Sequence, residues 1–247
     1  MHRHLMRIVI GTAIVLVMAA IAVPWIVYGS RPDAAIARVW ERLTAALSRP
    51  GSTGAKLSVV FDAQDHALSC EAAALKMALA VRDVHVSEGV IMDEVGYDPT
   101  PKEQQAGRVI WGDPQKGFVG NIDGRMPTTG YGVYWEPIAR AARTWRAARA
   151  VEGLTPGQLA QELAVGNPVI VWGYLGKGDS FEWQTPEGDT VHAVMHEHTF
   201  VAYGYVGTVE EPTGFYLMDP IYGSRFVDTE WIFDRMQKLG YGAVILY

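Results

Sequence analysis

The spacing of apolar residues changes partway along this chain, and this change constrains the fold more than any other feature. Apart from a short run at 56–61, apolar residues before Gly166 recur at helical spacing, and after Gly166 they alternate with polar residues as in strands. The expected helices cover residues 33–48, 70–81, 87–95, 136–149 and 155–166. The expected strands cover residues 56–61, 169–174, 181–184, 191–194, 198–205, 214–218 and 241–246. Helices followed by strands in this order indicate an α+β domain with an antiparallel sheet.

An uncharged apolar segment, residues 8–28, precedes this domain. It lies between Arg7 and Arg31 and is long enough to cross about 30 Å of hydrocarbon as a helix. Residues 20–22 have the small-x-small form of a cleavage site, but the apolar run continues beyond them. We predict that residues 1–30 form a signal anchor or a signal peptide, and we favour an uncleaved anchor. The following domain is expected outside the cytoplasmic membrane, held by this single span, or secreted if the segment is cleaved.

The rest of the chain divides into a connector and one large domain. Residues 31–54 are interpreted as a helical stalk and a linker, and residues 55–247 as the domain. Hydrophobic residues make up 49% of the chain, which is enough for a full core. A net charge of -6 without a local Lys/Arg cluster argues against nucleic-acid binding. The chain has one cysteine, so no intrachain disulfide can form. The oligomeric state is left open.

That cysteine, Cys70, stands at the start of a predicted helix. The positive end of the helix dipole and the unpaired N–H groups there favour a thiolate over a thiol. Cys70 is therefore a candidate nucleophile. The alternative is that it is a small buried hydrophobic residue, which is the commoner role of a lone cysteine.

Three polar residues are candidate partners for this thiol. His198 opens an alternating strand and is suited to act as a base at a sheet edge. Asp219 ends another strand, directly before Pro220, and its carboxylate could orient the imidazole. Gln64 precedes Cys70 closely enough for its side-chain amide to donate to the oxyanion that forms when the thiolate attacks a carbonyl.

The order Gln64, Cys70 on a helix, a distant His198 opening a strand and then Asp219 resembles papain-like cysteine peptidases. The chain is more narrowly similar to the bacterial branch related to bacteriocin-processing, double-glycine leader peptidases, as an exported stand-alone member. The similar stretches are residues 70–79, 111–114, 117–120, 131–134, 166–169, 198–205 and 218–220. The resemblance covers residues 57–246.

This resemblance implies a papain-like fold with a helical lobe, an antiparallel sheet lobe and a cleft between them. Cys70 would attack a peptide carbonyl, His198 would carry the proton, Asp219 would orient His198, and Gln64 would stabilise the oxyanion. The implied substrate is a peptide or protein, and the implied chemistry needs no cofactor and no metal.

The chain departs from the family pattern in two ways. Glu71 follows Cys70 where papain-like enzymes commonly have glycine, and its charge would raise the pKa of the thiol. No ATPase or multi-helix transporter region accompanies the domain, so leader processing during export is not expected. We also expect the loop at residues 98–135 to border the cleft and restrict what enters it.

Other functions were weighed against the peptidase. His192, His196 and His198 could form part of a zinc site, but they lack the helical spacing of a metallopeptidase motif. His66 is close to Cys70 but is expected to be a solvent-facing loop residue. A cell-wall peptide amidase or transpeptidase would use the same acyl-enzyme chemistry. A catalytically silent binding or scaffold module is the remaining alternative.

Overall fold

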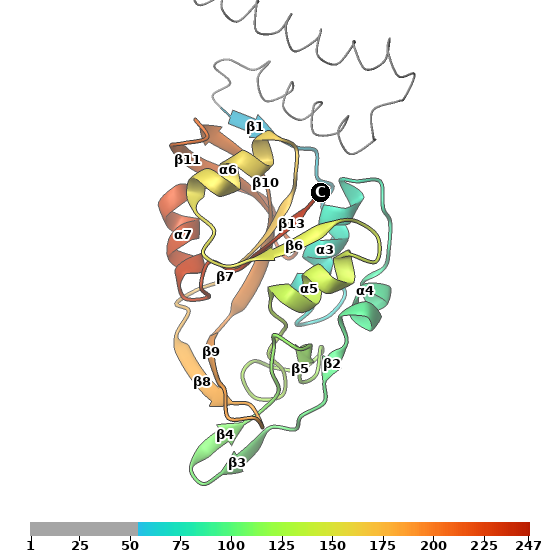
Figure 1. The fold of residues 1–247 in the computed structure, drawn as a ribbon, viewed down its shortest axis with the longest axis vertical. Helices are drawn as coiled ribbons and strands as arrows, with labels where there is room; N and C mark the ends of the chain where they lie inside the picture. The colour runs from blue at the N-terminus through green and yellow to red at the C-terminus, as the bar shows by residue number, and fades with distance from the viewer. Residues whose placement is uncertain (1–53) are drawn as a thin grey trace, which may run out of the picture. The chain divides into compact units, whose positions relative to one another are not determined.

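The computed structural model describes residues 54–247, shown in colour in Figure 1. The predicted membrane or signal segment at residues 1–30 and nearly all of the predicted stalk and linker lie outside these residues. Among the helices described, none has both the length and the apolar character needed to span a membrane. The described region begins at the expected start of the large domain.

An antiparallel sheet forms the centre of the domain, as the sequence predicts. Its strand order is β12-β11-β10-β7-β13-β6, and β1 pairs with the far end of β10. Every pairing in this sheet is antiparallel. The strands are β1 Gly54–Lys56, β6 Ala148–Val151, β7 Val169–Tyr174, β10 Glu197–Gly207, β11 Pro212–Asp219, β12 Gly223–Asp228 and β13 Ala243–Leu246.

Helices cover both faces of this sheet because its central strands are apolar on both sides. Along β7, Ile170 and Trp172 belong to one buried cluster, and Val169 and Val171 belong to another, as strand alternation requires. The first cluster includes residues of α3 Cys70–Ala80, α4 Glu88–Val95 and α5 Trp135–Ala142. The second includes residues of α6 Pro156–Ala164 and α7 Thr229–Gln237. The sheet is therefore held between two helical layers (Figure 1).

A smaller sheet lies at one end of the domain (Figure 1). It has the order β3-β4-β8-β9, formed by β3 Glu103–Gln105, β4 Arg108–Ile110, β8 Ser180–Gln184 and β9 Thr190–Val194. β2 Tyr97–Asp98 and β5 Phe118–Val119 form a separate parallel pair. Tyr131 packs edge-on against Trp183, with ring centroids 5.0 Å apart. Residues 98–135, predicted to be a loop, thus contain short strands anchored to aromatic side chains.

Several predicted boundaries are wrong, and in one case the cause is pairing between distant segments. The helix expected at residues 136–149 ends at Ala142, because Ala148–Val151 instead pairs with β13. Of the strand expected at residues 56–61, only Lys56 belongs to a strand. β12 and α7 were not predicted. The N-cap that starts α7 is nevertheless visible in the sequence, since the side chain of Asp228 accepts a hydrogen bond from the Trp231 N–H.

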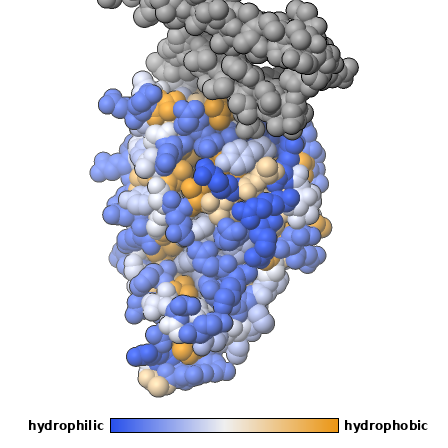
Figure 2. Space-filling view, in the orientation of Figure 1, coloured by the Kyte–Doolittle hydropathy of each residue, from blue (hydrophilic) through white to orange (hydrophobic). Residues whose placement is uncertain are grey.

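The outer surface is mainly polar. Figure 2 shows hydrophilic residues over most of the visible face, with hydrophobic patches scattered between them. Scattered exposed hydrophobic residues are ordinary on a folded domain. The exposed large hydrophobic residues are Val60, Phe61, Val90, Tyr97, Ile221, Tyr222 and Phe226.

Candidate active site

The cysteine begins helix α3, as predicted, but its surroundings differ from the expected ones. α3 is rich in alanine and almost wholly buried, so its backbone packs closely on the sheet. Ser69 precedes it without a side-chain cap, so the first N–H groups of the helix have no such partner. Cys70 is only 5% exposed, and its sulfur lies against Thr199 of β10. The nucleophile candidate is thus set into the interface between helix and sheet.

The Cys70 thiol is held by a neighbouring carboxyl group. Cys70 Sγ donates to Glu71 Oε2 at 3.3 Å. Burial raises the pKa of the thiol well above its usual value, and the neighbouring carboxyl groups of Glu71 and Glu197 raise this pKa further. The expectation that the helix N-terminus makes Cys70 a thiolate is therefore wrong for this state. The expectation that Glu71 raises the thiol pKa is confirmed.

Glu71 and Glu197, named here the carboxyl pair, are both buried beside the sulfur. Acceptor atoms of the two carboxyls and Cys70 Sγ lie within 4.8 Å of one another. Glu71 Oε1 also accepts from the Val133 N–H at 2.7 Å. Burial raises the pKa of Glu71 to about 7, and burial together with Glu71 raises the pKa of Glu197 well above its usual range. Two such carboxyls cannot both ionise easily.

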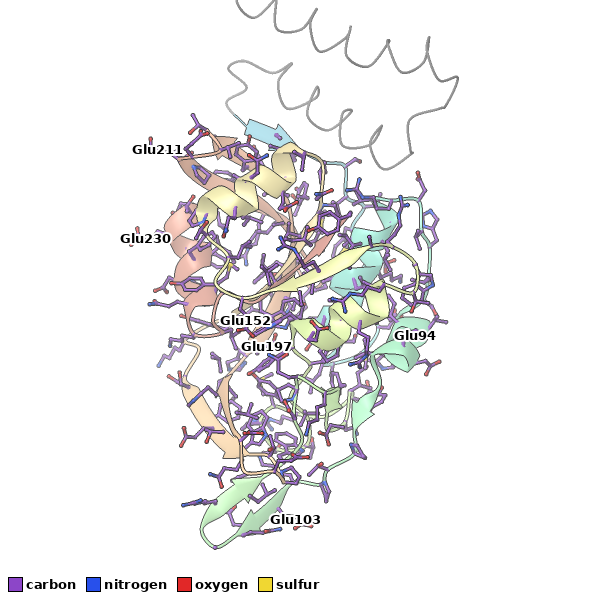
Figure 3. All side chains as sticks on the ribbon, viewed as in Figure 1. Glu94, Glu103, Glu152, Glu197, Glu211 and Glu230 are labelled. Atoms are coloured by element: carbon purple, nitrogen blue, oxygen red, sulfur yellow. The ribbon has the colours of Figure 1, made fainter. Side chains whose placement is uncertain are left out.

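Glu197 is a buried acid of the cleft that the sequence analysis did not single out. Figure 3 shows it in the interior of the domain, whereas Glu103 and Glu211 lie at the periphery. It is 6% exposed, and its Oε1 has no hydrogen-bond partner among the described residues. Strand alternation in the sequence places Glu197 and Thr199 on the same face of β10. The sequence does not show that this face is buried against Cys70.

His198 and Asp219, named here the His–Asp pair, are in contact as the sequence suggested. His198 Nε2 lies 2.9 Å from Asp219 Oδ1, and both side chains are buried. Asp219 Oδ1 also accepts from the backbone N–H of Ile221 at 2.8 Å and of Tyr222 at 3.2 Å. Burial alone would raise the pKa of Asp219, but the hydrogen bonds and the charge of His198 hold it below its usual value. The carboxylate is thus ionised and positioned.

The thiol and the imidazole share a cleft without touching. Cys70 and His198 both line a cleft of about 320 Å³, together with Gln64 and Glu197. Within residues 54–247, no hydrogen bond joins Cys70 Sγ to the imidazole. The structure therefore brings the predicted residues to one cleft and leaves the sulfur facing the carboxyl pair.

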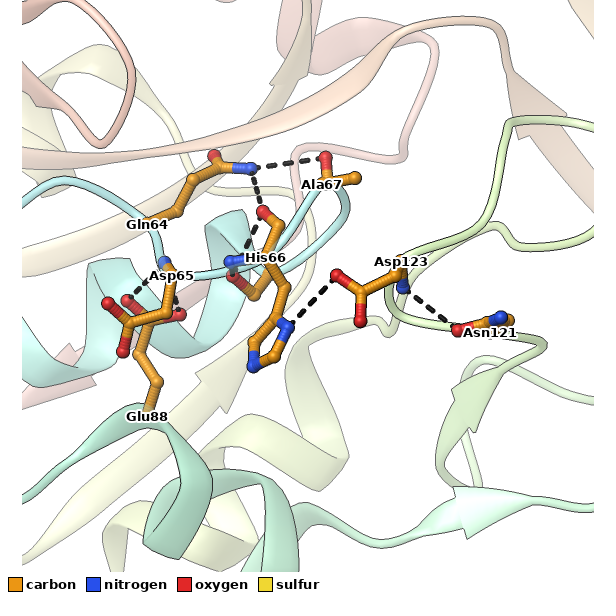
Figure 4. Close-up of polar contacts among 8 residues, drawn as sticks. Gln64, Asp65, His66, Ala67, Glu88, Asn121 and Asp123 are labelled. Atoms are coloured by element: carbon orange, nitrogen blue, oxygen red, sulfur yellow. Dashed lines mark hydrogen bonds and ion pairs between the residues drawn. The ribbon is translucent and has the colours of Figure 1, made fainter.

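Gln64 lines the same cleft, but its amide points to its own loop. Its Nε2 donates to the carbonyl oxygens of His66 and Ala67, at 2.7 and 3.1 Å (Figure 4). His66 Nδ1 lies 3.0 Å from Asp123 Oδ1, which ties this loop to the segment at residues 98–135. His66 is a surface loop residue, as expected. An oxyanion role for Gln64 requires its amide to give up one of these carbonyls.

A match to a known protein family covers residues 56–238, most of the chain. The family is described as the Peptidase_C39 like family. The chain belongs to this family. As a C39-like protein it is a cysteine peptidase with a papain-like arrangement of helices and sheet. A comparison with curated proteins gave no match.

Three solved structures are similar to this C39-like chain to different degrees. A C39-like peptidase from Bacillus anthracis is 24% identical, with a TM-score of 0.66 over 79% of this chain and 98% of that one. The peptidase domain of Streptococcus ComA is 14% identical, with a TM-score of 0.45 over 75% and 95%. A double glycine motif protease from an AMS/PCAT transporter is 16% identical, with a TM-score of 0.44 over 78% and 94%. Only the first likeness is high enough to support the fold.

The zinc alternative fails in this C39-like structure. His192 is mostly exposed and lies near Glu182, whereas His198 is committed to Asp219. Among the described residues, the group of side chains able to hold a metal ion is Cys70 with the carboxyl pair, and it contains no histidine. The long segment at residues 98–135 contributes Met126 and Tyr131 to the cleft, in line with the expectation that it borders the site.

Proposed function

We propose that this C39-like protein hydrolyses peptide bonds with Cys70 as the nucleophile and the His–Asp pair as its proton carrier. The observation that carries this proposal is the buried contact of 2.9 Å between His198 and Asp219 in the cleft that Cys70 also lines. A carboxylate that accepts from one ring nitrogen fixes the tautomer of the imidazole and stabilises its protonated form. The other ring nitrogen is then left for the thiol proton.

The chemistry proceeds through a thioester. The thiol proton passes to His198, the sulfur attacks the peptide carbonyl carbon, and the carbonyl oxygen becomes an oxyanion. The Cys70 N–H, at the uncapped start of α3, is a donor for that oxyanion. His198 then gives its proton to the leaving amine, and water hydrolyses the thioester with His198 as base. Gln64 becomes a second donor if its amide turns from the loop carbonyls to the cleft.

The site of action in this proposal is outside the cytoplasmic membrane. The support is the uncharged apolar segment at residues 8–28, which precedes the domain in sequence. A protease-protection assay on intact cells tests it, because an exported domain is digested by added protease while a cytoplasmic marker survives.

Cleavage of a mixed peptide library by the full chain tests the activity. Wild type is expected to release new peptide termini, and Cys70→Ala is expected to release none. Asp219→Asn keeps the shape of the His–Asp pair but loses the charge, so cleavage should fall by about a hundredfold or more. Thiol alkylation without cleavage of any peptide, across a broad library, would contradict the peptidase function and favour the scaffold alternative.

A further inference from the structure

The carboxyl pair has no part in the reaction proposed above, although a carboxyl oxygen of each glutamate lies within 4.8 Å of the sulfur. Glu71 is on α3 and Glu197 is on β10, so two separate elements bring a carboxyl to one sulfur. Buried carboxyls are costly unless they carry a proton or are fully hydrogen-bonded. The presence of two beside a nucleophile calls for a chemical explanation.

The surroundings of the pair fix Glu71 and leave Glu197 without a partner. The Val133 N–H donates to Glu71 Oε1, and the Val133 carbonyl accepts from the Trp172 indole at 3.0 Å. This segment is therefore anchored to the sheet at the point where it holds Glu71. Gly132 is also required here, because a Cβ at this position would collide with Glu71 Oε1. Glu197 Oε1 has no partner in the described part of the chain.

We propose that Glu71 is a pH-dependent gate on Cys70: its ionised carboxylate holds the sulfur as a thiol, and its protonated form releases the sulfur to His198. The proposal rests on the proposed peptidase function, because it explains what controls that nucleophile. Glu71 is a positioning residue, since it acts through Cys70.

The two states differ in which group donates the hydrogen bond. An ionised Glu71 can only accept, so it is satisfied by S–H and favours the thiol. A protonated Glu71 donates its O–H to the sulfur and so favours the thiolate. The protons balance, because Glu71 takes its proton from solvent and the thiol proton passes to His198 in the released state. Glu197 keeps its proton in both states, because a second charge in this buried space is strongly unfavourable.

Other titratable groups face the cluster from each packed element. His196, directly before β10, and His198 on β10 line the cleft, as does Tyr131 from the segment after β5. Asp219 of β11 is the partner of His198. Burial and the charges of Tyr134 and Glu197 raise the pKa of Tyr131 well above its usual value, so it stays neutral. Burial raises the pKa of Glu71 to about 7, so the gate changes state near neutral pH. The site is expected to be released on the acid side.

The test measures iodoacetamide alkylation of Cys70 in the full chain from about pH 5 to about pH 8. The chain has one cysteine, so every adduct reports this thiol. The amide in Glu71→Gln can still accept from the Val133 N–H and can donate to the sulfur, so it imitates the protonated gate. Its alkylation rate should match wild type near pH 5 and exceed it by about tenfold or more near pH 8, since one pKa unit changes the thiolate fraction about tenfold.

Glu197→Gln is the matched control, because it makes the same exchange in the same cluster. The pH profile of alkylation in Glu197→Gln should be that of wild type. The same is expected of Glu162→Gln, a second control at a half-buried position on α6 whose carboxylate accepts from Asn167. The proposal is overturned if the alkylation rate of Glu71→Gln depends on pH as in wild type. It is also overturned if Glu197→Gln, and not Glu71→Gln, loses the fall in alkylation rate toward about pH 8. If Glu71→Gln does not fold, infrared titration of the wild-type carboxyl band replaces it, and the absence of a change near pH 7 contradicts the gate.

Two further outcomes separate this proposal from its neighbours. In one, added Zn²⁺ protects Cys70 of wild type from alkylation but not Cys70 of Glu197→Gln. That result would show that the cluster binds a metal ion, and it would overturn the gate. A pH-gated thiol in a protein that cleaves no peptide would leave the gate standing and refute the peptidase function, because alkylation needs no substrate.

Discussion

The His–Asp pair and the carboxyl pair both contain buried acids, but the pKa of the acid is shifted in opposite directions in the two pairs. In the His–Asp pair, the carboxylate accepts an imidazole and two backbone N–H groups, and the pKa of Asp219 is lowered. In the carboxyl pair, Glu71 accepts the Val133 N–H and the Cys70 thiol, its neighbour Glu197 is another acid, and burial raises the pKa of Glu71. The difference teaches that the charge of the neighbouring side chain helps to decide which buried acid keeps its charge.

Removing the imidazole should have the largest effect. His198→Ala takes away the proton carrier, so peptide cleavage should fall by about a thousandfold. Alkylation of Cys70 at about pH 8 should stay as slow as in wild type, because ionised Glu71 still holds the sulfur as a thiol. Rates of peptide cleavage and of alkylation, measured on the same preparation, check this. Equal cleavage by the variant would mean that another group serves as the base.

A side chain added next to the carboxyl pair should have the second-largest effect. In Gly132→Ala, the added Cβ meets both Glu71 and Glu197, and Gly132 has a φ of 153°. The expected loss is about 2 kcal/mol in the free energy of unfolding. Gly153→Ala is the control, because Gly153 has a positive φ of 66° and open space around its Cα. Urea unfolding of both variants checks this, and equal losses would show that backbone strain alone is at work.

The pH dependence of stability should have opposite signs for the two clusters. Glu71 has a pKa of about 7 in the folded chain and about 4.5 otherwise, so between these values the folded state holds a proton that the unfolded state lacks. Its contribution to stability is present below about pH 4.5 and is lost as pH rises to about 7. The contribution of Asp219 is present above its usual pKa and is lost as pH falls below it.

Urea unfolding across this pH range, in wild type and in Glu71→Gln, measures the difference. The variant should lose the decline between about pH 4.5 and about pH 7, because it has no proton to release. A decline of the same size in both proteins would assign it to other groups.

The ion pair at the edge of the His–Asp pair should matter least. Arg225 Nη1 lies 3.7 Å from Asp219 Oδ2, and the arginine side chain is 36% exposed. Solvent screens such a contact, so Arg225→Gln should change the free energy of unfolding by less than about 1 kcal/mol. Thermal unfolding checks this. A loss as large as that of Gly132→Ala would mean that Arg225 holds Asp219 in place.

The sequence predicted those features that depend on local pattern. β7 has the predicted bounds, residues 169–174, because its continuous apolar run can only be a buried strand between turn residues. Cys70 begins α3 as predicted, and His198 and Asp219 meet because each lies at an end of a recognisable strand. These features can be predicted from the spacing of apolar residues, the turn residues and the order of the elements along the chain.

The remaining features depend on which surfaces come together. The end of α5 could not be predicted, because residues 148–151 pair with β13, almost a hundred residues later in the chain. The state of Cys70 could not be predicted either. Its helix position favours a thiolate, but burial against β10 and the approach of Glu197 outweigh that effect. Both depend on contacts between distant segments.

The most direct test of the account is the intact mass of the full chain after treatment with a peptide-based, cysteine-directed electrophile. At about pH 5, where protonated Glu71 releases the sulfur, we expect one adduct, on Cys70, that forms rapidly in wild type and slowly in His198→Ala, since the imidazole must take the thiol proton for attack. Equal rates in the two proteins, or no adduct in either, would contradict the claim that Cys70 and the His–Asp pair act together.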